Sequence, residues 1–106
     1  MPKYMFAASY TKQGLDGVRA EGAQARVDAL APVFESMGGH LDGFYFAFGD
    51  VDAYALAELP DDETAAAVAL AVSSSGAVTT RTIKLLTADQ VDAAIAKAVP
   101  YRAPGA

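Results

Sequence analysis

The sequence contains no cysteine, tryptophan or asparagine and only one histidine, and these absences exclude several kinds of chemistry. Without cysteine there is no disulfide framework, thiolate zinc site, iron–sulfur cluster or catalytic thiol. A single histidine cannot supply the multi-histidine sites typical of catalytic zinc. The sequence therefore predicts neither a metal site nor a bound cofactor.

Positive charge is also scarce, with 8 Lys and Arg against 13 Asp and Glu and a formal net charge of -5. No basic field exists to attract phosphates or anionic lipids, so we expect neither nucleic acid nor a membrane as a partner. No window approaches 18 uninterrupted apolar residues, and no cleavable leader pattern is visible. We expect a soluble, cytoplasmic protein.

What is present is an apolar chain of domain size: 106 residues, of which 53% are hydrophobic and 20% charged. This composition predicts a single globular domain, placed at residues 1–99, with an irregular C-terminal tail at residues 100–106. A domain this short has only a small hydrophobic core, so chains of this length are often stabilised by association with another chain.

Patterning along the chain predicts seven elements. Period-two and β-branched runs predict strands at residues 3–11, 40–48, 51–59 and 77–86. Helical periodicity and capping residues predict helices at residues 15–37, 62–75 and 88–98, capped in the last two cases by Asp61 and Thr87. Pro32 should kink or break the first helix, and Gly49-Asp50 should form a two-residue turn between the middle strands. The order is that of an α+β, ferredoxin-like βαββαβ domain with an antiparallel four-stranded sheet.

The predicted strands carry apolar residues on both faces. In residues 40–48, Phe44, Phe46 and Phe48 share one face, while Leu41, Tyr45 and Ala47 share the other. Helices cover only one face of such a sheet, so the other needs a different cover. Covering roughly 400 Å² of apolar surface contributes about 10 kcal/mol before association costs, at about 25 cal/mol per Å². We therefore expect a homodimer or higher homo-oligomer that pairs sheet to sheet.

Several motifs together resemble a known family. The run Gly49-Asp50-Val51-Asp52, an apolar strand and then Glu58-Leu59-Pro60-Asp61-Asp62 resemble the signature of GYD-domain proteins. The Tyr10-Thr11-Lys12-Gln13-Gly14 run, the Gly38-Gly39 pair and the Thr79-Thr80-Arg81-Thr82 strand are similar to the same family, so the likeness spans about residues 3–90. Val51 stands where that family usually has tyrosine, which removes the hydroxyl from this position.

The resemblance implies a bacterial-type cytoplasmic domain of uncharacterised activity, with the fold and association of the dimeric α+β barrels. That superfamily includes cofactor-free oxygenases, haem-handling enzymes, isomerases, polyketide cyclases and ligand sensors. Its ligands bind in the barrel interior or in the cleft between sheet and helices. Fold alone does not supply an activity.

His40 and Asp52 are the candidate catalytic bases. His40 is the only side chain whose unperturbed titration lies near neutrality, and Asp42 lies two residues on, on the same strand face. Asp52 lies inside an apolar strand and needs a partner or solvent, with Arg81 or Lys84 as the expected partner. The alternative for His40 is a solvated strand start.

Tyr10, Asp50, Asp52 and Tyr54 are the candidate ligand-binding residues. Asp50 and Asp52 lie two apart and point the same way in an extended chain, although Asp50 is explained equally well by turn formation. The tyrosines offer hydroxyl donors, or else belong to the core or an interface.

Three functions stay open at this point. The first is a small homo-oligomeric binder of an apolar or aromatic small molecule in a sheet–helix cleft. The second is a cofactor-independent isomerase, cyclase or oxygenase-like enzyme that uses His40 or Asp52 as base and Tyr10 as hydrogen-bond donor. The third is a purely structural assembly subunit.

Overall fold

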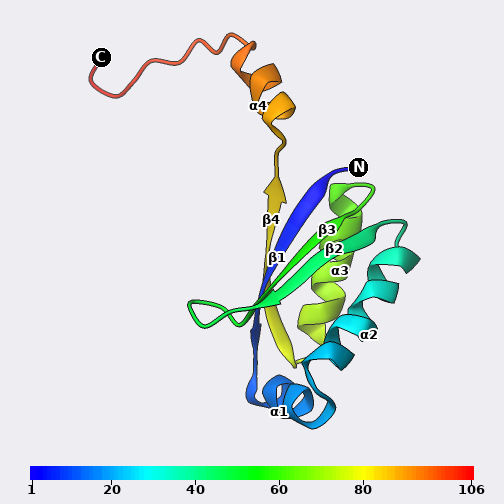
Figure 1. The fold of residues 1–106 in the computed structure, drawn as a ribbon. Coiled ribbons are helices and arrows are strands. Elements are labelled where there is room, and N and C mark those ends of the chain that lie inside the picture. Colours follow the sequence, from blue (N-terminus) through cyan, green and yellow to red (C-terminus); the bar gives the residue numbers. More distant parts are fainter.

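The computed structural model describes all 106 residues and contains four strands and four helices. In chain order they are β1 (Lys3–Tyr10), α1 (Lys12–Glu21), α2 (Ala23–Ser36), β2 (His40–Phe46), β3 (Ala53–Glu58), α3 (Asp62–Ser74), β4 (Val78–Leu85) and α4 (Ala88–Ile95). Helices α2 and α3 lie side by side against one face of the sheet, and α1 lies at its lower end (Figure 1).

The four strands form one antiparallel sheet in the order β2-β3-β1-β4. The central strand β1 places Phe6 opposite Ala55 of β3 on one side and Thr82 of β4 on the other. The predicted α+β, ferredoxin-like fold is therefore confirmed. A bulge between Leu41 and Gly43 interrupts the pairing of β2 with β3.

The predicted single helix at residues 15–37 is wrong, because the chain forms two helices that meet at Gly22. Gly22 has φ +94°, a left-handed value that L side chains rarely adopt, so it ends α1 and begins a new direction. Pro32 lies inside α2, which continues past it to Ser36. The break is thus set by the glycine ten residues before the proline.

The two-residue turn at Gly49-Asp50 is also wrong. Strand β2 ends at Phe46 and β3 begins at Ala53, and the loop between them is closed by the Ala47 amide, which donates to the Asp52 carbonyl at 2.8 Å. Phe48 therefore lies in the loop, fully exposed, and shares no strand face with Phe44 and Phe46.

The core lies between the sheet and helices α2 and α3. Phe6 and Phe34 contact each other across it, with ring centroids 5.6 Å apart. The alanines of β3 are buried, and their small side chains let the helices approach the sheet closely. The buried cluster comprises Tyr4, Phe6, Leu30, Phe34, Ala55, Ala57, Leu59, Ala65 and Val68.

Both predicted helix caps are present. The Asp61 carboxylate accepts from the Thr64 amide at 2.8 Å at the start of α3. Thr87 and Gln90 form a reciprocal capping box at the start of α4. Both helices therefore begin directly after the capping residues that the sequence indicated.

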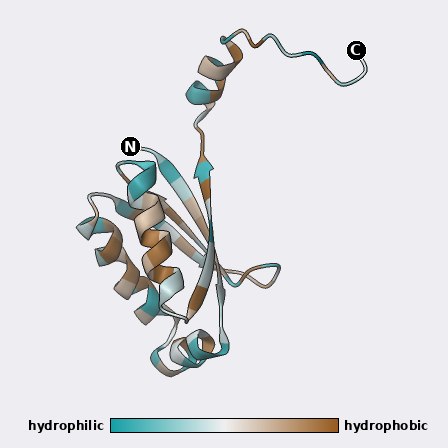
Figure 2. Cartoon of the chain, turned by 180° about the vertical axis from the view of Figure 1, so that it is seen from behind, coloured by the Kyte–Doolittle hydropathy of each residue, from teal (hydrophilic) through white to brown (hydrophobic).

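The opposite face of the sheet carries no helix (Figure 1). Helix α4 does not cover it, because β4 leads the chain away from the body and α4 projects with no buried residue (Figures 1 and 2). Ile95, Val99 and Tyr101 are each about three-quarters exposed on this projecting segment. We call residues 86–106 the C-terminal arm. None of the four helices has the length and apolar character needed to span a lipid bilayer.

Candidate functional site

An apolar cavity lies between the helix-covered face of the sheet and helices α2 and α3. Its enclosed volume is about 30 Å³, and ten of its twelve lining residues are hydrophobic. Two of the aromatic rings of its wall come from Phe6 and Phe34, which also form the core contact described above. The full lining is Phe6, Ala8, Tyr10, Arg26, Leu30, Phe34, Phe44, Ala55, Val68, Val72, Val78 and Thr80.

Tyr10 lies at the end of β1 and places a hydroxyl at the cavity. Its ring stacks on Phe46 with centroids 6.5 Å apart. Burial raises the pKa of the Tyr10 phenol, and the nearby Arg26 guanidinium opposes this without overcoming it. Tyr10 is therefore a neutral hydroxyl that can donate to a ligand.

Arg26 is the charged residue of the cavity lining. It was not among the candidate residues predicted from the sequence. It lies on α2 four residues before Leu30 and eight before Phe34, so the three share one helix face. Its side chain forms no ion pair, and its Nε is buried without a hydrogen-bond partner. The i, i+4, i+8 spacing with two core residues is the signal that could have found it.

An outer hollow of about 230 Å³ adjoins the cavity and shares Tyr10, Arg26 and Val78 with it. Helix α1 forms much of the rest of its wall, where Gly14 lies against the Ala77 carbonyl. The remaining lining residues are Gln13, Gly17, Val18, Glu21 and Ala77. Tyr10 and Arg26 thus lie at the mouth of the apolar cavity, where it opens into this more polar outer hollow.

Asp52 lies near this end of the sheet, but it has a structural partner. Its Oδ2 accepts a hydrogen bond from the backbone amide of Tyr10 at 2.8 Å. The expected pairing with Arg81 or Lys84 is wrong, because Lys84 pairs with Asp62 at 3.0 Å and Asp52 forms no ion pair. Asp52 holds the end of β1 and so the backbone that carries Tyr10.

Asp50 and Tyr54 lie on the uncovered face, away from the cavity. Both line a wide hollow there together with Met5, Ala7, Val51, Arg81, Thr82 and Ile83. The structure therefore brings Tyr10 and Asp52 together by a backbone hydrogen bond, and it separates this pair from Asp50 and Tyr54.

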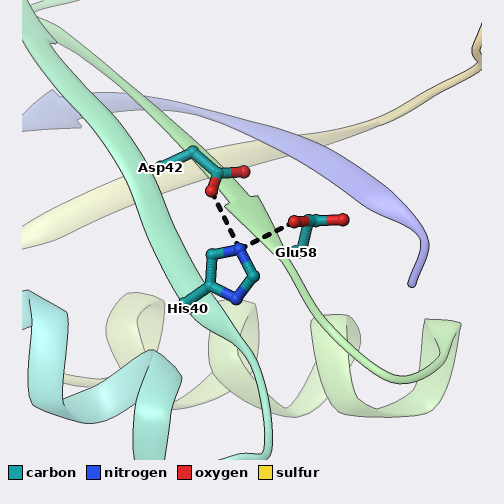
Figure 3. A group of neighbouring side chains, drawn as sticks. All are labelled: His40, Asp42 and Glu58. Atoms are coloured by element: carbon teal, nitrogen blue, oxygen red, sulfur yellow. Dashed lines mark ion pairs between the residues drawn. The ribbon is translucent and has the colours of Figure 1, made fainter.

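His40 belongs to a polar cluster on the uncovered face (Figure 3). Its Nε2 lies 3.0 Å from Asp42 Oδ1 and 2.7 Å from Glu58 Oε2. The bulge in β2 brings Asp42 beside His40, and the strand register places Glu58 opposite His40. The expected proximity of His40 and Asp42 is thus present, whereas the contribution of Glu58 was not anticipated.

Lys3 completes this cluster from β1. Its Nζ lies 3.7 Å from Asp42 Oδ2 and 3.6 Å from Glu58 Oε1. Burial alone would raise the pKa of Glu58, but Lys3 and His40 outweigh it and hold that pKa below its usual value. His40, Asp42 and Glu58 present the donor atoms that a divalent cation uses, and the Lys3 ammonium already pairs with both carboxylates.

A second polar cluster joins α3 to the sheet. The Tyr4 hydroxyl donates to Asp62 Oδ1 at 2.6 Å, and Lys84 reaches the same oxygen at 3.0 Å. Burial, the Asp62 hydrogen bond and neighbouring acidic groups raise the pKa of Tyr4 to about 12. These contacts hold the first turn of α3 against β1 and β4.

Comparison with known proteins identifies one family. The family model described as the GYD domain matches residues 4–95, and the comparisons with curated proteins and with solved structures return no match. Val51 of the Gly49-Asp50-Val51-Asp52 run is 6% exposed. Because the match covers most of the 106 residues, from the first strand to the last helix, the chain belongs to the GYD-domain family.

Proposed function

We propose that this chain is a small homo-oligomeric protein that binds an apolar or aromatic small molecule between its sheet and helices. The observation that carries the proposal is the cavity itself, which combines an almost wholly hydrophobic lining with Tyr10 and Arg26 at one end. A hydrophobic pocket with a few polar groups directed into it is the usual form of a small-molecule site.

The homo-oligomeric part of the proposal is supported by the uncovered face and the C-terminal arm. Ile83 is 42% exposed and Tyr45 is 64% exposed on that face, although both lie within strands. The arm exposes further large apolar side chains, and its helix buries no residue against the rest of the chain. A second copy offers both an apolar face and an apolar arm, so each copy can cover the other.

The geometry favours binding over base-catalysed chemistry in this cavity. Neither His40 nor Asp52 lines it, and His40 lies on the opposite face of the sheet. A cofactor-independent enzyme with either residue as base would need its substrate elsewhere in the molecule. A purely structural subunit is the remaining alternative, and such a subunit would bind no ligand.

A panel of neutral apolar and aromatic compounds tests the proposal by thermal shift and by nuclear magnetic resonance titration. Ligands should raise the melting temperature and shift resonances of the cavity lining. Ala8→Val should weaken this binding, because Ala8 lines the cavity and a larger strand residue narrows it.

Ser9→Val is the matched control on the opposite face of the same strand, and it should leave binding unchanged. Ligands that shift only residues of the uncovered face, or equal binding by both variants, would contradict the cavity as the site. If neither these compounds nor their carboxylate analogues bind, the structural-subunit alternative is favoured.

A further inference from the structure

We propose that the ligand is an anion: a small carboxylate, or a comparable oxyanion, that carries an apolar group. Its charged end binds Arg26 and Tyr10 at the mouth, and its apolar group enters the cavity. This inference rests on the proposed function and adds the chemical class of the ligand. It uses Arg26, to which no role was assigned from the sequence.

The first argument is the hydrogen-bonding state of Arg26. A guanidinium carries five N–H donors and is always charged, and its buried donors need acceptors. The Nε of Arg26 is buried and has none, the only such side-chain atom in the protein. A buried donor left unpaired costs free energy that an incoming acceptor recovers, and a carboxylate fits the planar fork best.

The second argument is the charge around the site. Arg26 is the only Lys or Arg among the residues that line the cavity and its outer hollow. The only carboxylate among those residues is that of Glu21, which is exposed and forms no ion pair with Arg26. In a chain of net charge -5, Arg26 thus forms no ion pair with any carboxylate.

The third argument is the arrangement of polar and apolar surfaces. Arg26 and Tyr10 both line the outer hollow and the inner cavity, so they mark the boundary between the two. Tyr10 offers a neutral hydroxyl donor beside the guanidinium, and the rest of the inner wall is hydrophobic apart from Thr80. A ligand that follows this pattern has one acidic end and one apolar end. The volume of about 30 Å³ is below the roughly 150 Å³ of an apolar cavity that holds a benzene ring, so the lining side chains must move apart as a ring enters.

The decisive comparison uses the unaltered protein with benzoate and benzamide, which have nearly the same size and differ in charge. Binding is measured by nuclear magnetic resonance titration at constant ionic strength. Benzoate should bind at least 10-fold more tightly, because a hydrogen bond to a charged group contributes about 10- to 100-fold in affinity. Acetate, which lacks the apolar group, should bind much more weakly than benzoate.

Arg26→Gln should remove this preference. Benzoate affinity should fall at least 10-fold while benzamide affinity stays the same, a split that a general loosening of the fold does not produce. Arg19→Gln, which removes an exposed arginine of α1, is the matched control and should retain the preference. If Arg26→Gln does not fold, Arg26→Lys should show an intermediate preference, since it keeps the charge and loses the fork.

Equal affinity for benzoate and benzamide overturns the inference and leaves the proposed function standing. Equal affinity for acetate and benzoate also overturns it, because the site would then recognise an anion without an apolar group. If benzoate fails while neutral compounds of the panel bind, only the anionic class is wrong. If benzoate and the whole panel fail, the proposed function is wrong as well.

Discussion

The contacts of individual charged residues in this protein come from partners distant in the sequence more than from sequence neighbours. His40 and Asp42 are two residues apart, but the contact that completes their cluster comes from Glu58 on the adjacent strand. Asp52, inside an apolar strand, is satisfied by the Tyr10 amide and by no cation. Arg26 is the exception, because its Nε has no partner at all.

The Glu58 cluster makes a prediction about pH. The folded-state pKa of Glu58 is lowered from its ordinary value of 4.5, so its ion pairs stabilise the fold above that value and are lost as pH falls through the lowered pKa. Glu58→Gln should reduce the free energy of unfolding at pH 7 and make its decline between about pH 5 and pH 3 shallower. Urea unfolding across this range measures both effects.

Glu35→Gln is the control for this experiment, because Glu35 is exposed and forms no ion pair. It should leave the pH profile close to that of the unaltered protein. A Glu58→Gln profile parallel to that of the unaltered protein would show that the cluster does not stabilise the fold.

At the scale of elements, close approach of the backbone decides where α1 lies. A Cβ on Gly14 would come within 2.0 Å of the Ala77 carbonyl oxygen, so only glycine permits this contact between α1 and the start of β4. Thr11 strengthens the same junction, since its amide donates to the Ala77 carbonyl at 3.0 Å. The outer hollow depends on this placement because α1 forms part of its wall.

Two alanine substitutions in α1 should therefore have opposite effects. Gly14→Ala should destabilise the protein by more than about 1 kcal/mol, because either α1 or β4 must move. Gly17→Ala meets nothing within 4 Å and should stabilise it by up to about 1 kcal/mol through helix propensity. Chemical denaturation of the two variants provides the comparison, and similar effects at both positions would argue against the tight junction.

At the scale of the whole molecule, the protein has a helix-covered side, an uncovered side and an arm that leaves both (Figure 1). The longest principal extent is 56 Å against 22 Å for the shortest, and the arm accounts for the elongated outline in Figures 1 and 2. An eight-residue helix with no buried residue is marginal in water, so we expect α4 to pack on a second copy.

Removal of the arm tests where that surface lies. The full chain at micromolar concentration should sediment as a dimer or larger oligomer, and a chain ending at Leu85 should shift toward the monomer. Lys97→Glu changes one exposed charge in the arm and is the control for general effects of altering this segment. A full chain that sediments as a monomer contradicts the proposed association.

Much of this fold was predictable from local pattern. The four strands, α3 and α4 lie within a few residues of their predicted positions, and both predicted caps are present. The sequence predicted a kink or break at Pro32 and not at Gly22, because the proline was the more prominent signal and the left-handed Gly22 looks like any other helical glycine in the sequence. Of the site, Tyr10 was predicted and Arg26 was not, since a lone arginine on a helix is ordinarily solvated.

The sequence by itself determined the order of elements, the family and the excess of apolar strand residues, because periodicity, capping and turn chemistry act over a few neighbours. Only the tertiary structure decided which charged groups meet. Glu58 joins His40 through strand register, and Asp52 binds an amide 42 residues away. Arg26 reaches the cavity because α2 packs with its Leu30 and Phe34 face toward the sheet. Such contacts depend on long-range packing, which no short stretch of sequence specifies.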